Sequence, residues 1–274
     1  MNVPPFRMVR PAVWRHGAPA AGAPRNIPEE TAIALTFNRE TYAVMMATPA
    51  DLADFALGFA LSEGIVGQPS EIASLDILEH PRGIELRMEL AAPRLAALTA
   101  RRRRVAGPTG CGLCGIDSLA EAVRVPRPVP SGRVFDAAEI AEALRSIEPL
   151  QVLNRATRAV HGAALWTPAH GVRLLREDVG RHNALDKLLG AAAHAGVSAE
   201  TGLLLLTSRV SIEMVQKAAV LGAPVMVAVS APTAHALRLA EAAGMTLIAI
   251  ARNDGFEVFC GGHRIVEKRE AHVA

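Results

Sequence analysis

The chain has 274 residues, of which 50% are hydrophobic and 20% are charged, and its formal net charge is +2. This length can bury one large core or two smaller ones, whereas a charge so close to neutral argues against a general nucleic-acid binder. The apolar runs are far shorter than a membrane span, and three cysteines are too few for a disulfide framework. We therefore expect a soluble, cytoplasmic protein with no role in a membrane or on nucleic acid.

Residues 1–30 are rich in Pro, Ala and Gly and contain no apolar segment like that of a signal peptide. We predict a flexible tail here. A small α+β domain is predicted at residues 31–125, where the strand-like runs TAIALTF, TYAVMMA and GIELRMEL surround one helix in TPADLADFALGFALSEGI. In that helix, Thr48 is the expected N-cap and Gly64 the expected stop.

Three prolines in VRVPRPVPSG separate this unit from a second predicted domain, residues 126–274. DAAEIAEALRSI is typical of a helix. Further along, the apolar strands GLLLLTS, APVMVAVS and MTLIAIAR alternate with the helices SIEMVQKAAVLG and PTAHALRLAEAAG. This alternation predicts parallel strands with helices packed on the sheet. The expected fold class is therefore α/β in this half and α+β overall.

Ligands of such a sheet bind beyond the carboxyl ends of its strands. Polar residues follow three of the predicted strands at that edge: Thr207, Ser208, Arg209, Ser230, Thr233 and Arg252. Hydroxyls, helix N-termini and arginines at one edge favour a phosphate-bearing ligand. The alternative is that the hydroxyls only cap helices and the arginines are solvated.

Cys111 and Cys114 lie in the glycine-rich stretch GPTGCGLCGIDS, shortly after four consecutive arginines at 101–104. A structural zinc site would need a second pair of ligands, and neither Cys260 nor the nine histidines supply one at matching spacing. The H-x-E and P-C-x-x-C signature of zinc deaminases is also missing. We therefore expect no resident metal.

Two redox or nucleotide interpretations of this stretch fit poorly. A thioredoxin-like dithiol lies at a helix N-terminus, whereas SLAE is a capping box whose helix begins only after Ser118. The glycines match G-x-G-x-x-G, but no predicted strand precedes them. Two interpretations stay open: a glycine turn that happens to contain two cysteines, and a flexible segment whose thiolates, stabilised by the arginines, carry sulfur.

The chain resembles the FdhD/NarQ family of formate dehydrogenase accessory sulfurtransferases. The likeness runs from about Thr31 to Ile265 and is carried by TPADLADFALGFALSEGI, CGLCGIDS, REDVGRHNALDK and SIEMVQK…SAPT. It implies a carrier that takes persulfide sulfur from a cysteine desulfurase and passes it to the molybdenum cofactor, in its bis-guanine-dinucleotide form, for formate dehydrogenase. By this resemblance, Cys111 is expected to carry the persulfide. Cys114 is expected to be its partner, which helps the transfer or resolves a spent persulfide. The likeness also implies a homodimer and, in residues 126–274, a cytidine-deaminase-like three-layer α/β/α domain.

The same resemblance places cofactor binding after the last long strand, at Ile250, Ala251, Arg252, Asn253, Asp254 and Gly255. Arg252 is best suited to phosphate, because a guanidinium can make bidentate contacts with it. REDVGRHN offers a second group of candidates, namely Asp178, Arg181, His182 and Asn183. We expect Asp178 to accept hydrogen bonds from the edge of a guanine and the helix N-terminus to bind phosphate. The alternative is that this segment is an ordinary polar turn with no ligand. A guanine nucleotide is expected to mimic the cofactor.

Two departures from the family pattern concern this pocket. Arg-Ala-Val at 158–160 precedes His161, where the family commonly has Thr-Gly-Gly, and Ile250 stands where it commonly has Phe. The first departure puts ligand contacts at that turn in doubt, and the second removes a surface on which a guanine would stack. Cys260 lies outside every matched motif and is predicted to be a small core or edge residue.

Two other functions stand as alternatives to sulfur transfer. The first is an escort for the molybdenum cofactor or a nucleotide, which would need neither cysteine. The second is a deaminase-like hydrolase, against which the missing H-x-E motif counts.

Overall fold

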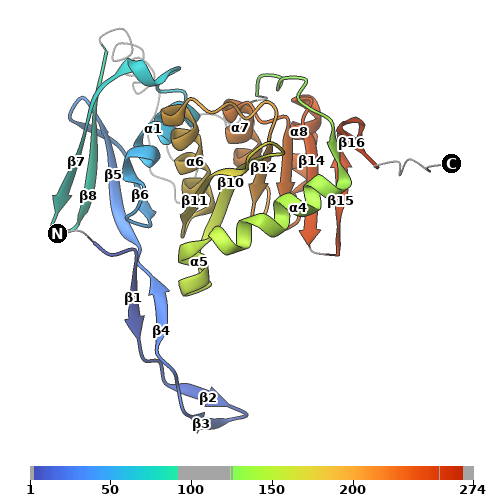
Figure 1. Ribbon diagram of the computed structural model, residues 1–274. Helices are drawn as coiled ribbons and strands as arrows, with labels where there is room; N and C mark the ends of the chain where they lie inside the picture. The colour runs from blue at the N-terminus through green and yellow to red at the C-terminus, as the bar shows by residue number, and fades with distance from the viewer. Residues whose placement is uncertain (1–2, 92–123, 125, 253, 268–274) are drawn as a thin grey trace.

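The computed structural model describes residues 3–91, 124, 126–252 and 254–267. Two α/β units lie side by side, and an N-terminal ribbon extends away from both (Figure 1). Strands and helices are mixed throughout, which confirms the predicted fold class of α/β within an α+β chain. Cys111, Cys114 and Asn253 lie outside the described residues.

The first unit is a four-stranded sheet in the order β6-β5-β8-β7. Its elements are β5 (Thr31–Phe37), β6 (Glu40–Ala47), α1 (Leu52–Ser62), η1 (Pro69–Glu71), β7 (Ile72–His80) and β8 (Gly83–Leu90). Alternate side chains of β5 and β8 are buried against helix α1, as expected when one face of a sheet is covered. The larger members of this core are Ile33, Leu35, Phe37, Phe55, Phe59, Leu86 and Met88.

The second unit is a six-stranded sheet in the order β11-β10-β12-β13-β14-β15. The strands are β10 (His161–Thr167), β11 (Gly171–Asp178), β12 (Leu203–Leu206), β13 (Val225–Ala228), β14 (Thr246–Arg252) and β15 (Gly255–Cys260). The three strands predicted from their apolar runs, β12, β13 and β14, pair in parallel as expected. Antiparallel pairing adds β10 and β11 at one side and β15 at the other.

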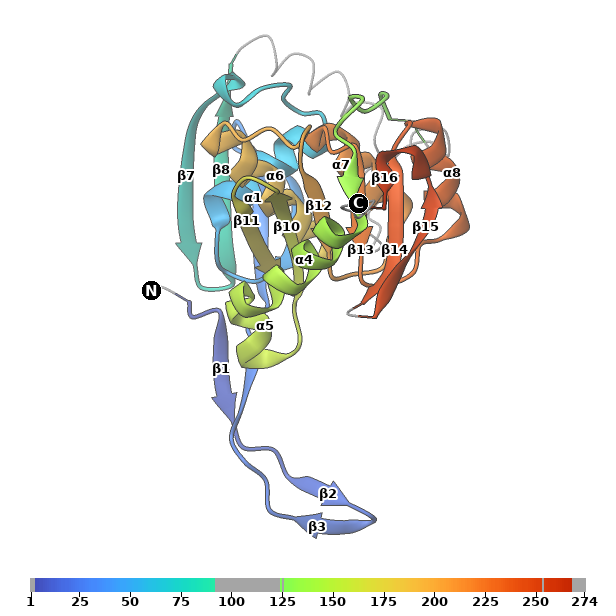
Figure 2. The ribbon, with the colours of Figure 1, turned by 45° about the vertical axis from the view of Figure 1, so that its right-hand side comes forward.

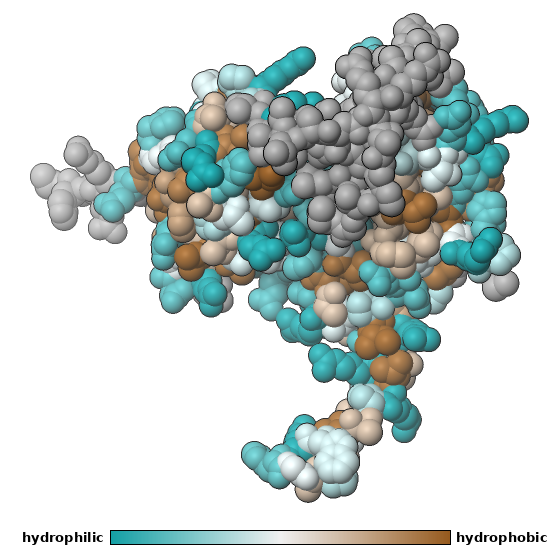
Figure 3. Space-filling model, turned by 180° about the vertical axis from the view of Figure 1, so that it is seen from behind, coloured by the Kyte–Doolittle hydropathy of each residue, from teal (hydrophilic) through white to brown (hydrophobic). Residues whose placement is uncertain are grey.

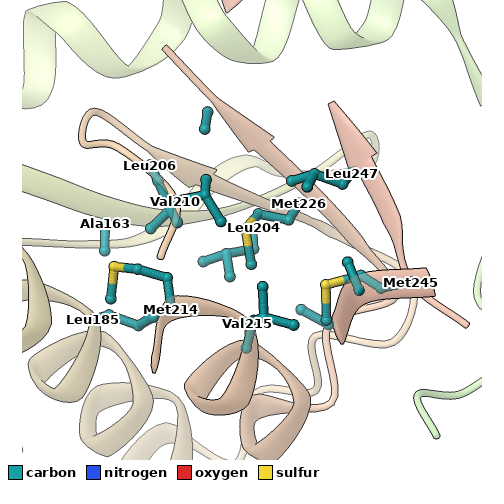
Figure 4. Close-up of a cluster of buried hydrophobic side chains, with 14 of the residues drawn as sticks. Ala163, Leu185, Leu204, Leu206, Val210, Met214, Val215, Met226, Met245 and Leu247 are labelled. Carbon is teal, nitrogen blue, oxygen red and sulfur yellow. The ribbon is translucent and has the colours of Figure 1, made fainter. Parts of the chain in front are cut away.

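Helices cover both faces of this sheet, so the second unit has the three layers predicted for it. On one face lie α6 (Arg181–Ala195), α7 (Ile212–Leu221) and α8 (Ala234–Ala242), and on the other lies α4 (Ala137–Ile147). Figure 4 shows the core on the three-helix side, where Met214 and Val215 of α7 pack against Leu204, Met226 and Leu247 of the sheet. The remaining short elements are β9 (Phe135–Asp136), η2 (Glu148–Leu150), α5 (Val152–Thr157), η3 (Gly262–Arg264) and β16 (Ile265–Val266).

Residues 6–28 form two antiparallel ribbons where the sequence predicted a flexible tail. Strand β1 (Phe6–Val9) pairs with β4 (Arg25–Pro28), and β2 (Val13–Arg15) pairs with β3 (Ala18–Ala20). The ribbons point away from both sheets (Figures 1 and 2). The prediction missed them because the sequence has no clear alternation of polar and apolar residues here, and β1 pairs with β4 across the intervening hairpin.

Helix α1 begins later than predicted, because Asp51 and not Thr48 occupies the N-cap position, with a left-handed φ of 52°. Thr48 is fully buried and bonds instead to the second unit. The predicted stop is confirmed, since Gly64 adopts a φ of 67° immediately after the C-cap residue Glu63. Within the described part of the chain, no helix is both long and apolar enough to cross a membrane.

Candidate functional site

One edge of the six-stranded sheet brings together the ends of five strands. The parallel strands β12, β13 and β14 have their carboxyl ends there. Strand β10 runs antiparallel to β12, and its first residue, His161, pairs with Asp178 at the end of β11. The polar residues that follow the three parallel strands therefore lie at the same edge as His161 and the start of helix α6.

Helix α6 presents Arg181 and His182 at this edge. Burial lowers the pKa of His161, and the nearby charge of Arg181 lowers it further, which places these two side chains within electrostatic reach of each other. The Nε atom of Arg181 and the Nε2 atom of His182 are both buried without a hydrogen-bond partner among the described residues. A buried donor without a partner is uncommon in folded proteins, so the Nε–H of Arg181 is available to a ligand.

Glu213 in the first turn of helix α7 faces the same histidine. Its Oε2 atom lies 3.9 Å from His182 Nε2, which is too far for a hydrogen bond. Interaction with His182, and to a smaller extent with Ser211, lowers the pKa of Glu213 to about 2. The edge therefore carries an ionised carboxylate beside its cationic groups.

An NMR titration of the Glu213 carboxyl should give a midpoint near 2 in the wild type, against an ordinary value of 4.5. Because the folded-state pKa is lowered, this group stabilises the fold above pH 4.5, and its contribution is lost as the pH falls toward 2. In His182→Ala the midpoint should move back toward 4.5, whereas His235→Ala on helix α8 should leave it in place. A wild-type midpoint near 4.5 would contradict this pairing.

Asp178 and Asn183 do not face a ligand, contrary to the sequence expectation. Asp178 is fully buried, and its two oxygens accept from four donors. These are Lys187 Nζ at 2.6 Å, Gly180 N at 2.8 Å, and Thr48 N and Asn183 Nδ2, each at 3.0 Å. Asn183 also donates to the carbonyl of Met46 at 2.9 Å. Both residues hold the first unit against the second and leave no free group for a guanine edge.

The two residues before Asp178 on strand β11 also bind other parts of the chain. Arg176 reaches Asp54 of helix α1, with Nη2 at 2.6 Å and Nε at 2.8 Å from Oδ2. Glu177 is buried and accepts from the backbone N–H groups of Leu153 and Asn154, both at 2.8 Å, at the start of α5. Residues 176–178 of the REDVG segment are therefore the end of strand β11, and their charged side chains join separate elements.

A second buried ion pair lies next to the first, because its carboxylate, Asp186, directly precedes Lys187 on helix α6. Lys217 Nζ is 2.7 Å from Asp186 Oδ1, and the hydroxyl of Ser62 at the end of α1 is 2.6 Å from the same oxygen. Burial alone would lower the pKa of Lys217, but the charges of Asp186 and Glu63 raise it above its ordinary value. The sequence did not predict this cluster, because Lys217, Asp186 and Ser62 come from three helices that are far apart along the chain.

Three of the hydroxyls predicted to bind phosphate have structural partners. Thr207 Oγ1 accepts from Gly162 N at 2.8 Å, and Thr233 caps helix α8 by accepting from Ala236 N at 3.2 Å. Ser208 is buried, with its Oγ donating to the carbonyl of Arg209 at 3.2 Å. For these three residues the capping and structural interpretation holds. The side chains of Arg209 and Arg252 are exposed at the edge and stay candidates for phosphate.

Strand β14 ends in an irregularity at the stretch predicted to bind the cofactor. Ile250 has a φ of 51°, in the left-handed region that β-branched residues almost never adopt. Its backbone N donates to the carbonyl of Ser230 at 3.4 Å, which joins the last residues of β14 to the loop after β13. Strained residues of this kind concentrate at ligand sites. The neighbouring Asp254 and Gly255 are exposed, as Arg252 is.

The departure at 158–160 does not open the turn before His161. Arg158 ends helix α5 in the left-handed region, with a φ of 56°, and its backbone N donates to the carbonyl of Asn154. Val160 is buried. This turn is thus made with the larger side chains of Arg158 and Val160.

Cys260 is half-buried on strand β15, where it packs against the main core and its Sγ atom lies 3.3 Å from the carbonyl oxygen of Met245. Burial raises the pKa of its thiol, so little thiolate forms near neutral pH. Its prediction as a small core or edge residue is confirmed. Among the described residues, no three His, Cys, Asp or Glu side chains are grouped closely enough to hold a metal ion.

The profile of the FdhD/NarQ family matches residues 28–266. The chain belongs to this family. It is 48% identical over 262 residues to the sulfur carrier protein FdhD of Agrobacterium fabrum. The aligned region covers 95% of this chain and 96% of that protein. The sulfur carrier protein FdhD of Brucella abortus is 51% identical over 244 residues, covering 89% of this chain and 91% of the relative.

A solved structure supports the same family assignment. The crystal structure of a proposed formate dehydrogenase accessory protein from Desulfotalea psychrophila superposes with a TM-score of 0.76 at 27% sequence identity. The superposition covers 96% of this chain and 100% of the Desulfotalea psychrophila chain. The FdhD/NarQ fold therefore extends over nearly the whole chain.

Proposed function

We propose that this FdhD/NarQ family member is a cytoplasmic sulfur carrier for the maturation of formate dehydrogenase. It accepts persulfide sulfur from a cysteine desulfurase and transfers it to the molybdenum cofactor in its bis-guanine-dinucleotide form. The observation that carries the proposal is the C-G-x-C-G sequence around Cys111 and Cys114 in a chain whose close relatives are named sulfur carrier proteins.

The chemistry is an exchange at sulfur. The thiolate of Cys111 attacks the outer sulfur of the desulfurase persulfide, forming a new S–S bond while the donor's S–S bond breaks and its cysteine leaves as a thiolate. The product is a persulfide on Cys111, and no net oxidation takes place. Cys114 assists transfer to the cofactor or resolves a persulfide that has not been used, and the arginines at 101–104 favour the thiolate form.

The molybdenum cofactor is a substrate of this reaction, and we place it at the sheet edge where five strands end. Its two guanine dinucleotides carry several phosphates, which arginine recognises well. Arg209 and Arg252 are exposed at that edge, and Arg181 has a buried Nε that finds no hydrogen-bond partner within the described part of the chain. The strained Ile250 supports the same location. The proposed assembly is a homodimer.

Intact-protein mass spectrometry tests sulfur transfer directly. After incubation with a cysteine desulfurase and cysteine, the wild-type chain should gain the mass of one sulfur atom. Cys111→Ala should abolish this gain and lower formate dehydrogenase activation at least 100-fold, whereas Cys114→Ala should still acquire sulfur. Cys260→Ala is the matched control, because its thiol is half-buried and has a raised pKa.

A wild-type chain that gains no sulfur would contradict the proposal, provided that the desulfurase loads another acceptor. If a variant lacking both Cys111 and Cys114 also activated formate dehydrogenase fully, the cofactor-escort interpretation would replace sulfur transfer.

A further inference from the structure

A groove of about 960 Å³ lies where the two units meet the proline-rich linker that joins them. Its walls are the end of α1 with the turn that follows it, the linker from Arg124 to Pro128, the last turns of α6, and the second half of α7. These helices lie on the side of the molecule opposite to α4, the side seen in Figure 3, where apolar side chains are exposed between polar ones. The groove is therefore built from both units together.

The floor of the groove is apolar. Leu61 and Val66 contribute to it from the first unit, and Leu189, Val197 and Val220 from the second. Val220 is 46% exposed. The volume is at the upper end of the range for small-molecule pockets, and an apolar channel between helices is a typical binding site for the apolar face of another helix.

The rim of the groove is basic. Arg124 and Arg127 line it and are exposed, and no Asp or Glu is among its described lining residues. The nearest carboxylates are bonded within the chain, since Glu63 lies 3.7 Å from the buried Lys217 and Glu71 accepts from the backbone of the turn before η1. An acidic side chain of a partner would therefore meet uncompensated positive charge at the rim.

Both ends of segment 92–123, which contains the two cysteines of the C-G-x-C-G motif, are attached beside this groove. At one end, Ala91 N donates to the carbonyl of Glu71 at 3.0 Å, in the 3-10 turn η1 that borders the groove. At the other end, Gln216 Nε2 donates to the carbonyl of Arg124 at 3.0 Å. A partner bound in the groove would touch both points from which the cysteine segment departs.

The spacing along the chain brings the cysteines within reach of such a partner. Ten residues lead from Cys114 to Arg124, and a chain of that length spans at most roughly 33–36 Å. Residues 92–128 also contain seven arginines against one Asp and one Glu. The cysteine segment and the groove rim thus have the same positive charge, which favours a partner with an acidic surface.

We propose that this groove docks an amphipathic helix with acidic flanks that belongs to the enzyme donating persulfide sulfur to Cys111. The apolar face of that helix covers the floor, and its carboxylates pair with Arg124 and Arg127. The sheet edge assigned to the cofactor lies at the N-terminal ends of α6 and α7, whereas the groove lies toward their C-terminal ends, so a docked donor leaves that edge free. The inference rests on the proposed function and assigns the surface for its first step.

Isothermal titration calorimetry of the full chain with a cysteine desulfurase tests this docking. Arg124→Glu/Arg127→Glu at the rim and Val220→Asp on the floor should each raise the Kd at least 10-fold. Sulfur loading of Cys111 should slow by a similar factor at low desulfurase concentration and recover at saturating concentration, because only docking is impaired. The wild-type Kd should also rise with salt.

The matched controls make the same changes on other exposed surfaces of the second unit. Arg173→Glu/Arg238→Glu alters two exposed arginines, and Val258→Asp alters a valine that is 43% exposed on β15. Both controls should keep the wild-type Kd, and all four variants should keep the wild-type melting temperature, since each changes only exposed side chains. Controls that weaken binding as much as the groove variants would overturn the proposal.

A small persulfide donor separates docking from sulfur transfer. With glutathione persulfide in place of the desulfurase, the groove variants should gain sulfur as fast as the wild type. Groove variants that bind the desulfurase with the wild-type Kd would overturn the docking site and leave sulfur transfer standing. A wild type that gains sulfur from neither donor would overturn the proposed function, and the docking site with it.

Discussion

Replacing Lys187 by Met should lower the free energy of unfolding by about 3–5 kcal/mol, because the change leaves a buried carboxylate without its cation. Lys187 and Asp178 are both fully buried, with 2.6 Å between Nζ and Oδ2. The ammonium also donates to the carbonyl of Thr48 at 2.9 Å, so its loss takes a donor from that carbonyl as well. Urea denaturation of the full chain measures the effect.

The double variant Asp178→Asn/Lys187→Met is the matched test of this explanation. With the carboxylate neutralised as well, at least half of the lost stability should return, because the remaining penalty is that of polar groups and not of an unpaired charge. Additive losses in the double variant, or a loss below 1 kcal/mol in Lys187→Met, would show that the pair does not act as a buried ion pair.

Gly58→Ala and Gly190→Ala should each destabilise the protein by roughly 2–3 kcal/mol. In an ordinary helix the same change stabilises by about 1 kcal/mol. Here helices α1 and α6 cross with their backbones in contact. A Cβ on Gly58 would collide with the carbonyl of Asp186 and lie 2.8 Å from Gly190 N, and a Cβ on Gly190 would collide with the carbonyl of Asp54. Backbone atoms cannot rotate out of the way as a side chain does.

The control is Ala195→Gly at the exposed end of α6, where helix propensity alone should decide the change in stability. Adding a methyl group at Gly190 and removing one at Ala195 should both lower the melting temperature, although helix propensity predicts opposite effects. A more stable Gly190→Ala variant would mean that the two helices can separate at little cost.

The second unit was largely predictable from its sequence because its signals are local. The runs GLLLLTS, APVMVAVS and MTLIAIAR are buried on both faces of the sheet and alternate with amphipathic helices, so neighbouring residues suffice to predict each element. The helical pattern of DAAEIAEALRSI predicted α4 in the same way, and the structure adds a capping box between Asp136 and Glu139 at its start. The ribbons of residues 6–28 have no such signal, because their small residues and prolines neither alternate nor bury a face.

The candidate site was predictable only in part, because the unpredicted part depends on distant contacts. Thr48 looks like an N-cap and Asp178 looks like a ligand residue when each is judged by its neighbours in sequence. The two bond to one another across the interface between the units. By contrast, the position of Arg252 and Ser230 at a strand end follows directly from the order of strands and helices, and the structure places both there.

The charged residues at the junction of the two units also affect how the chain unfolds. Asp178, Lys187, Asp186 and Lys217 complete their bonding with Thr48 and Ser62, which belong to the first sheet and its helix. If either half opened separately, these groups would lose partners while still largely enclosed by the other half. Partial opening is therefore disfavoured, and the two units behave as one cooperative foldon. Neither half should be regarded as an autonomous module, although each has a hydrophobic core of its own.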